Sequence, residues 1–74
     1  MSYRINMLWD DDAAVWVATS PDVPGLGLES GSFDALVEKV KVAVPEIIEM
    51  NGTKPDTLRL PYFTEREDKV AVYG

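Results

Sequence analysis

Residues 32–52, SFDALVEKVKVAVPEIIEMNG, carry the pattern of one amphipathic helix. Ser32 can cap the first turn through its side-chain oxygen, and the carboxylate of Asp34 favours the positive helix start. Apolar residues then recur at spacings of three, four and seven, and Asn51 with Gly52 supplies a left-handed stop. We therefore predict a helix over residues 33–50. Its apolar face consists of Phe33, Leu36, Val37, Val40, Val44, Ile47 and Ile48.

Pro45 lies inside this helical pattern. An interior proline removes one backbone hydrogen bond and costs roughly 3 kcal/mol. We predict either a kink at this position or a break into two segments with different axes. Burial of Val44 and Ile47 is expected to offset the loss.

Three short β-strands are predicted before the helix. Residues 3–9 alternate with the period of a half-buried strand. Residues 14–19 are rich in β-formers, and the three aspartates at 10–12 favour a hairpin turn between these strands. Residues 20–25 contain two prolines and a glycine, so regular pairing pauses there before a short strand over residues 26–30.

The second predicted strand is apolar on both faces, as expected for a central strand. Val15 and Val17 point to one side, and Trp16 and Ala18 point to the other. Because one helix covers only one face of a sheet, we expect Leu8 and Trp16 to leave apolar area on the opposite face. An exposed patch of that kind predicts self-association.

Two further β-like segments follow the helix. Residues 57–64 are typical of a strand, which Pro61 confines to the rim of the sheet because proline cannot donate to a ladder. Residues 69–73 could extend this strand, fold back on it or pair with another subunit. The predicted oligomer interface consists of Trp16, Val70, Val72 and Tyr73.

The element order β-β-β-α-β indicates one α+β domain over residues 1–74. The first and third strands of a meander are parallel to each other. A right-handed crossover through the helix can therefore place the fourth strand beside the first and parallel to it. We predict a four-stranded, mostly antiparallel sheet in the order 3-2-1-4, with the helix on one face.

The composition narrows the classes of function. The 74 residues include no cysteine and no histidine, which removes thiolate metal sites, the usual zinc ligand and the usual general base. A formal net charge of −6 disfavours nucleic acid as a direct ligand and favours a basic partner. No apolar run is long enough to span a bilayer and no signal peptide is visible, so we expect a cytoplasmic protein. We expect no cofactor. A domain of this size often relies on a second subunit, so we also expect a homo-oligomer.

The most conspicuous polar cluster is Asp10, Asp11 and Asp12. A calcium-binding loop would need alternating ligands, a glycine at its sixth position and a glutamate at its twelfth, and these are missing. We interpret the cluster as a solvated hairpin turn, with an acidic patch for a basic partner as the functional alternative. No pair of acids converges in a predicted cleft, and no histidine is present to activate a serine, so no catalytic or metal-binding residue is assigned.

The ordered combination of these segments resembles the HicB-like antitoxin family. The matching stretches are residues 15–18 (VWVA), residues 20–26 (SPDVPGL) and the helix beginning near Ser32. The helix end VPEIIEMNG and the closing strand are most similar to a small HicB-like subgroup. The family's turn motif corresponds to Asp22, Pro24 and Gly25. In that turn Asp22 is expected to bond to backbone, Pro24 to fix φ and Gly25 to adopt a conformation that other residues avoid.

The resemblance implies a partly degraded ribonuclease-H-like fold that acts by binding. Its partner in the family is HicA, a small basic RNA-cleaving toxin, and the acidic N-terminal half of this chain suits such a partner. Family members carry a C-terminal DNA-binding segment, whereas this sequence closes on a β-like run, so DNA binding is not carried over. The alternative is an orphan structural or regulatory homo-oligomer without a toxin partner. We assign partner contact to Asp10, Asp11, Asp12 and Asp22.

Overall fold

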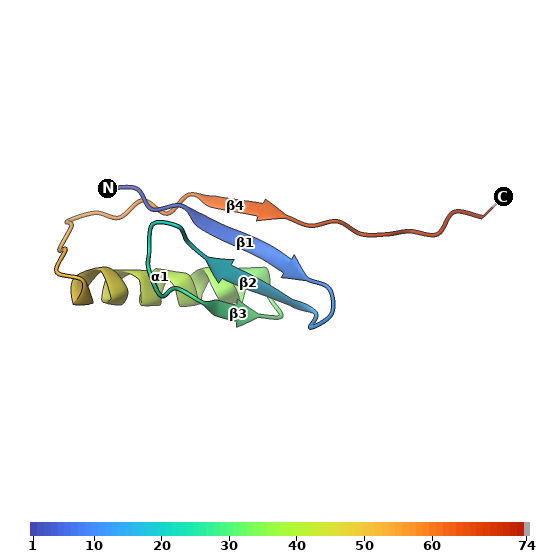
Figure 1. Cartoon of the computed structure of the whole chain (residues 1–74), viewed down its shortest axis with the longest axis horizontal. Helices are drawn as coiled ribbons and strands as arrows, with labels where there is room; N and C mark the ends of the chain where they lie inside the picture. The colour runs from blue at the N-terminus through green and yellow to red at the C-terminus, as the bar shows by residue number, and fades with distance from the viewer. Residues whose placement is uncertain (74) are drawn as a thin grey trace.

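The computed structural model describes residues 1–73, so position 74 of the expected domain lies outside the described residues. The chain forms a meander of three strands, one long helix and a fourth strand (Figure 1), which confirms the predicted order. The helix has the predicted bounds, whereas each strand differs from its prediction by a few residues at its ends. The elements are β1 (Ile5–Asp10), β2 (Val15–Thr19), β3 (Leu28–Ser30), α1 (Phe33–Met50) and β4 (Tyr62–Glu65).

The strands form one sheet in the order β3-β2-β1-β4. β2 pairs antiparallel with both β1 and β3, and β4 pairs parallel with β1. This is the predicted topology, in which the helix returns the chain to the far side of β1. α1 lies across one face of the sheet and packs against β2 and β3.

Both ends of α1 are capped as the sequence predicts. The side-chain oxygen of Ser32 accepts a hydrogen bond from the Ala35 N–H at 3.3 Å. At the other end Gly52 adopts a φ of 87°, and its N–H donates to the Glu49 carbonyl at 3.0 Å. The N–H of Thr53 donates to the Ile48 carbonyl at 3.1 Å, which completes a Schellman motif.

Pro45 does not divide α1, which is continuous from Phe33 to Met50. Of the two predicted outcomes, the break into separate segments is therefore wrong. Pro45 itself is exposed, and the neighbouring positions Val44 and Ile48 are buried against the sheet. Burial on both sides of the proline holds the two halves of the helix on one apolar surface.

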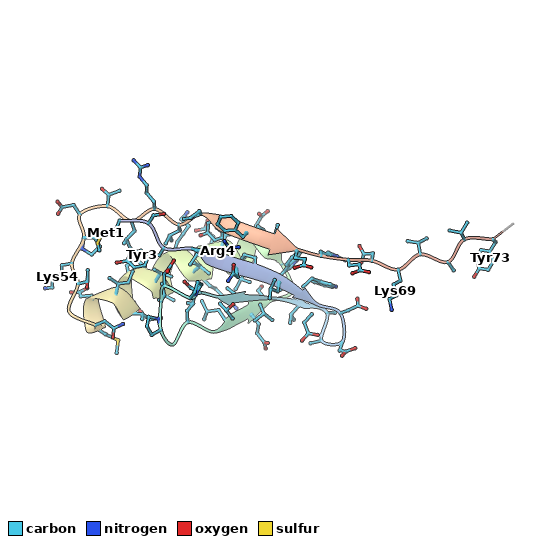
Figure 2. All side chains as sticks on the ribbon, turned by 45° about the horizontal axis from the view of Figure 1, so that its top comes forward. Met1, Tyr3, Arg4, Lys54, Lys69 and Tyr73 are labelled. Atoms are coloured by element: carbon cyan, nitrogen blue, oxygen red, sulfur yellow. The ribbon has the colours of Figure 1, made fainter. Side chains whose placement is uncertain are left out.

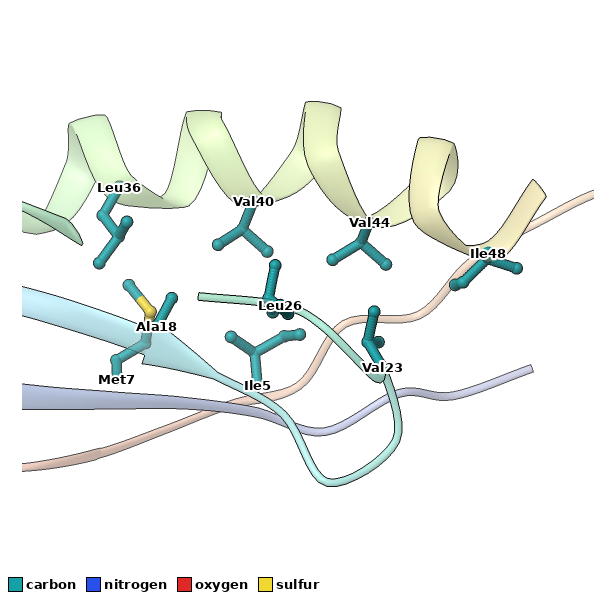
Figure 3. Close-up of a cluster of buried hydrophobic side chains, with 9 residues drawn as sticks. All are labelled: Ile5, Met7, Ala18, Val23, Leu26, Leu36, Val40, Val44 and Ile48. Atoms are coloured by element: carbon teal, nitrogen blue, oxygen red, sulfur yellow. The ribbon is translucent and has the colours of Figure 1, made fainter. Parts of the chain in front are cut away.

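The core lies between α1 and the sheet (Figure 3). One row of side chains comes from the helix, and the opposing row comes from β1, β2 and the loop between β2 and β3. The helical row reproduces the predicted apolar face, with Phe33, Val37 and Ile47 partly buried at its margins. The buried residues are Ile5, Met7, Ala18, Val23, Leu26, Leu36, Val40, Val44 and Ile48.

The fourth strand is at the edge of the sheet, as predicted, but begins at Tyr62 and not at residue 57. The preceding residues already run beside the N-terminus: the Tyr3 N–H donates to the Arg59 carbonyl and the Ile5 N–H donates to the Pro61 carbonyl, both at 2.9 Å. Pro61 has no N–H with which to continue the ladder, so regular pairing starts only after it.

The structure corrects the expected placement of Trp16. Side chains alternate along a strand, so Trp16 shares the face of Ala18, which is fully buried beneath α1. The Trp16 ring lies 5.0 Å from that of Phe33, in the first turn of the helix. Trp16 is therefore not on the open face, because the start of α1 covers it. Leu8 does lie on the open face, 45% exposed.

Residues 66–73 form an extended C-terminal arm that continues beyond β4 and leaves the sheet (Figure 1). Tyr73 lies far from the rest of the chain (Figure 2), whereas Lys69 still lines a hollow with Asp11. The described residues span 58 × 19 × 18 Å. Val70 is 79% exposed, and Val72 and Tyr73 are each 92% exposed. The arm therefore neither folds back on β4 nor joins the intrachain sheet, which leaves pairing with another subunit as the open alternative.

Candidate protein-binding surface

The three aspartates at the end of β1 and in the following turn form the hairpin connection to β2, as predicted. Oδ1 of Asp10 accepts hydrogen bonds from the backbone N–H groups of Asp12 and Ala13 at 3.1 and 3.2 Å. Asp10 thus holds the turn together, whereas the carboxylates of Asp11 and Asp12 are exposed to solvent. Ala14 closes the turn with a φ of 54°, a left-handed conformation that is unusual for alanine.

The parallel pairing of β4 with β1 brings a second group of acids to this turn. Asp11 lines one shallow hollow with Glu65, Arg66 and Glu67, and lines another with Glu67, Asp68 and Lys69. Nε of Arg66 lies 3.4 Å from Oδ2 of Asp68, so this acid is already paired within the chain. Sequence reasoning missed these later acids because they are far from the turn along the chain. We call this combined surface the acidic end, and it consists of Asp10, Asp11, Asp12, Glu65, Glu67 and Asp68.

An aromatic stack underlies the acidic end. The rings of Trp9 and Trp16 are 5.3 Å apart, and those of Trp16 and Phe33 are 5.0 Å apart, both in edge-to-face geometry. The guanidinium carbon of Arg66 lies 4.1 Å from the centroid of the Trp9 ring. Aromatic pairs of this geometry are worth about 0.5–1.5 kcal/mol beyond their buried area, so the stack fixes the position of the acidic turn.

Asp22 lies at the opposite end of the sheet from this surface. Its Oδ2 accepts a hydrogen bond from the backbone N–H of Arg4 at 2.7 Å, just before β1 begins. Asp10 is the last residue of the same strand, and Asp11 and Asp12 follow it. The structure therefore does not bring the four predicted partner-binding aspartates together, because the length of β1 separates Asp22 from the other three.

The turn at residues 22–26 has the expected backbone contact of Asp22 and the expected conformation of Gly25. The N–H of Leu26 donates to the Val23 carbonyl at 3.2 Å, so residues 23–26 form a tight turn with Pro24 and Gly25 at its centre. Gly25 has a φ of 87°, which glycine adopts without steric cost. The turn buries Val23 beneath the C-terminal half of α1.

Tyr62 holds an unpaired polar atom on the helix side of the sheet edge. Its hydroxyl oxygen is buried without a hydrogen-bond partner. Burial raises the pKa of this hydroxyl above its ordinary value of 10.0, while Lys41 acts to lower the pKa and Glu38 to raise it. Among residues 1–73, no group of three or more acidic side chains is arranged to hold a metal ion.

The geometry defines a small α+β domain with one helix on a mixed sheet. The chain belongs to the family described as "Domain of unknown function (DUF1902)", whose model matches residues 2–74. Among solved structures it is similar to the hypothetical protein TTHA1013 from the extremely thermophilic bacterium Thermus thermophilus, with 37% sequence identity and a TM-score of 0.81. That match covers 95% of this chain and 100% of the other. No curated protein matches the chain.

Proposed function

We propose that this protein is a non-catalytic binding module of the HicB antitoxin type. In this proposal the acidic end binds a small basic protein, an RNA-cleaving toxin of the HicA type. The observation that carries the proposal is the convergence of the Asp10–Asp12 turn with Glu65 and Glu67 at one end of the sheet. The resemblance of the sequence to HicB-like antitoxins supplies the identity of the partner.

Charge and residue type both support a protein ligand at this end. The chain carries 13 acidic and 7 basic side chains, and complementary charge increases the rate of encounter with a basic partner. Trp9 and Arg66 lie between the acids, and such residues are enriched at the centres of protein interfaces. An acidic rim around an aromatic centre therefore favours a basic protein over a small ligand.

The division of roles within the turn makes the proposal testable. Asp10 accepts two backbone hydrogen bonds, so replacing it would alter the turn itself. The backbone of the turn does not depend on the side chains of Asp11 and Asp12. Oδ1 of Asp11 accepts a hydrogen bond from the Trp9 indole N–H at 3.3 Å, and both carboxylates are exposed where a partner could meet them. Asp22 is left out of the proposed surface, because its carboxylate binds the backbone of Arg4.

The proposal places the protein in the cytoplasm, where a toxin of this type would meet it. Within residues 1–73 no helix is long and apolar enough to cross a membrane. Neither a ribonuclease activity of the chain itself nor DNA binding is part of the proposal. Its action is to cover the RNA-cleaving surface of the partner.

The test is affinity capture from native lysate, followed by quantitative binding of the captured protein. The account predicts a small basic protein in stoichiometric amount. The double charge reversal Asp11→Lys with Asp12→Lys should weaken its binding at least tenfold. The control is Glu46→Lys with Asp56→Lys, which changes net charge equally at exposed positions elsewhere and should affect binding much less. Capture of the bait alone, or equal loss in both variants, would contradict the assignment of this surface.

A further inference from the structure

β4 is an edge strand, and the C-terminal arm continues directly from it. A free strand edge is a template for pairing with another chain. We propose that residues 62–73 of one copy pair antiparallel with residues 62–73 of a second copy, across a two-fold axis beside Glu67. This pairing would make one sheet continuous through both copies. The inference rests on the sheet edge and the arm and not on the proposed toxin, although the pairing would involve Glu65, Glu67 and Asp68, which also belong to the acidic end.

The backbone of β4 limits how such pairing can occur. The Pro61 carbonyl accepts a hydrogen bond from the Ile5 N–H, so the backbone carbonyl of this odd-numbered residue points toward β1. Backbone groups of successive strand residues alternate between the two edges. The even-numbered residues Tyr62 and Thr64 therefore direct their N–H and C=O groups to the free edge.

In an antiparallel pair, hydrogen bonds are exchanged between residues whose backbone groups face each other. Even-numbered residues of one copy must therefore lie opposite even-numbered residues of the other. In a two-fold symmetric pair, even-numbered residues face even-numbered residues only when the axis passes beside a residue. When the axis passes between two residues, even-numbered residues face odd-numbered ones. Arg66, Glu67 and Asp68 are the central candidates for that position.

Charge selects among these three registers, because opposite charges directly across an antiparallel pair are favourable and like charges are unfavourable. With Glu67 on the axis, Glu65 lies opposite Lys69 and Arg66 lies opposite Asp68, and symmetry forms each pair twice. Only the two Glu67 side chains then repel each other. With Arg66 on the axis, Arg66 faces itself and Glu65 faces Glu67. With Asp68 on the axis, Asp68 faces itself and only the Glu67–Lys69 pair remains.

The selected register also covers the exposed valines of the arm. Val72 lies opposite Tyr62 of the second copy, and Val70 lies opposite Thr64. Tyr62 is on the helix side of the sheet, where it is partly buried against the core. α1 packs against β2 and β3, so at the β4 margin Tyr62 is only partly buried and Thr64 is exposed, and the two valines would cover these two residues. Their burial would supply the hydrophobic contribution to pairing.

The direction of the Arg66 side chain supports this assignment of faces. Arg66 stacks over Trp9 at 4.1 Å, and Trp9 shares the helix side of β1 with the buried residues Ile5 and Met7. The alternation of β4 therefore continues into the arm, with even-numbered residues on the helix side. Val70 and Val72 follow the same alternation if the arm stays extended.

Disulfide cross-linking tests the register directly, because the chain contains no cysteine. Glu67→Cys places two thiols opposite each other at a non-hydrogen-bonded pair, where Cα atoms are about 4.5 Å apart and within the range of a disulfide. Under mild oxidation this variant should form a covalent dimer at least tenfold faster than the matched control Asp68→Cys. Equal rates, faster cross-linking of Asp68→Cys, or no dimer from either variant would overturn the proposal.

Sedimentation of the uncross-linked protein gives a second measurement. The wild-type chain should have the mass of two chains at micromolar concentration. Lys69→Glu and Glu65→Lys should each raise the dimer dissociation constant at least tenfold, because each creates like-charge contacts across the pair. The combination Glu65→Lys with Lys69→Glu should restore association to within about threefold of the wild type. A single-chain mass for the wild type, or failure of the combination to restore pairing, would contradict it.

Discussion

The carboxylate of Asp22 is bound to the backbone of Arg4. Oδ2 of Asp22 accepts from the Arg4 N–H at 2.7 Å, and the hydroxyl of the neighbouring Ser20 donates to the Arg4 carbonyl. The same hydroxyl oxygen accepts from the N–H groups of Asp22 and Val23 at 3.0 and 3.2 Å. Two side chains of the loop after β2 thus satisfy both backbone groups of the residue before β1.

Replacing Asp22 should therefore affect folding more than partner binding. Asp22→Ala removes a charged acceptor from a backbone N–H, and we expect the free energy of unfolding to fall by about 1–2 kcal/mol. Asp56→Ala, at an exposed loop position, should change it by less than about 0.5 kcal/mol. Urea denaturation followed by tryptophan fluorescence measures both. Similar stability of the two variants would remove the structural role of Asp22.

Gly25 and Gly27 form a matched pair for testing the turn between β2 and β3. A Cβ at either position would meet no atom within 4 Å, but only Gly25 has a positive φ, of 87°. Gly25→Ala should lower the free energy of unfolding by about 1–2 kcal/mol through backbone strain alone. Gly27→Ala should be neutral or slightly stabilising. Thermal unfolding of the two variants decides this, and equal melting temperatures would argue against the strain.

The hairpin turn offers a site for stabilisation at Ala14. Its φ of 54° suits glycine better than alanine. Ala14→Gly should raise the free energy of unfolding by up to about 1 kcal/mol, whereas Ala13→Gly should lower it slightly through added chain entropy. Chemical denaturation of both variants provides the comparison. Destabilisation of equal size in both would show that the left-handed conformation of Ala14 carries no strain.

Tyr62 gives the protein a dependence on alkaline pH. Burial raises the pKa of its hydroxyl in the folded state, so the unfolded chain loses this proton at a lower pH than the folded chain. The free energy of unfolding should therefore decrease as the pH rises above about 10. Tyr62→Phe should weaken this decrease, and near neutral pH it should add about 1 kcal/mol by removing an unsatisfied buried oxygen. Denaturation series at neutral and alkaline pH test both effects, and an unchanged alkaline slope in Tyr62→Phe would contradict the assignment.

The helix, its caps and the strand order could be predicted because their signals are local. Ser32 and Gly52 have the predicted capping roles at the two ends of α1. The side of Trp16 could not be predicted, since β2 is apolar on both faces and only the position of Phe33 in the first turn of α1 decides which face is covered. Pro45 was tolerated because burial of its neighbours outweighs one lost hydrogen bond.

The acidic end could be predicted only in part. The Asp10–Asp12 turn is visible in the sequence, whereas the arrival of Glu65 and Glu67 depends on the parallel register that places Leu8 beside Glu65. The topology was predicted, but the exact register was not, because Pro61 delays the start of β4. A one-residue shift in register would have sent these side chains to the opposite faces of the sheet.

Inhibition of RNA cleavage is the measurement that tests the proposed function most directly. The basic protein captured on this chain should cleave RNA on its own, and one equivalent of the wild-type chain should stop the cleavage. The variant with Asp11→Lys and Asp12→Lys should need at least tenfold more protein for the same inhibition, while the variant with Glu46→Lys and Asp56→Lys should match the wild type. Undiminished cleavage in the presence of excess wild-type chain would contradict the antitoxin function.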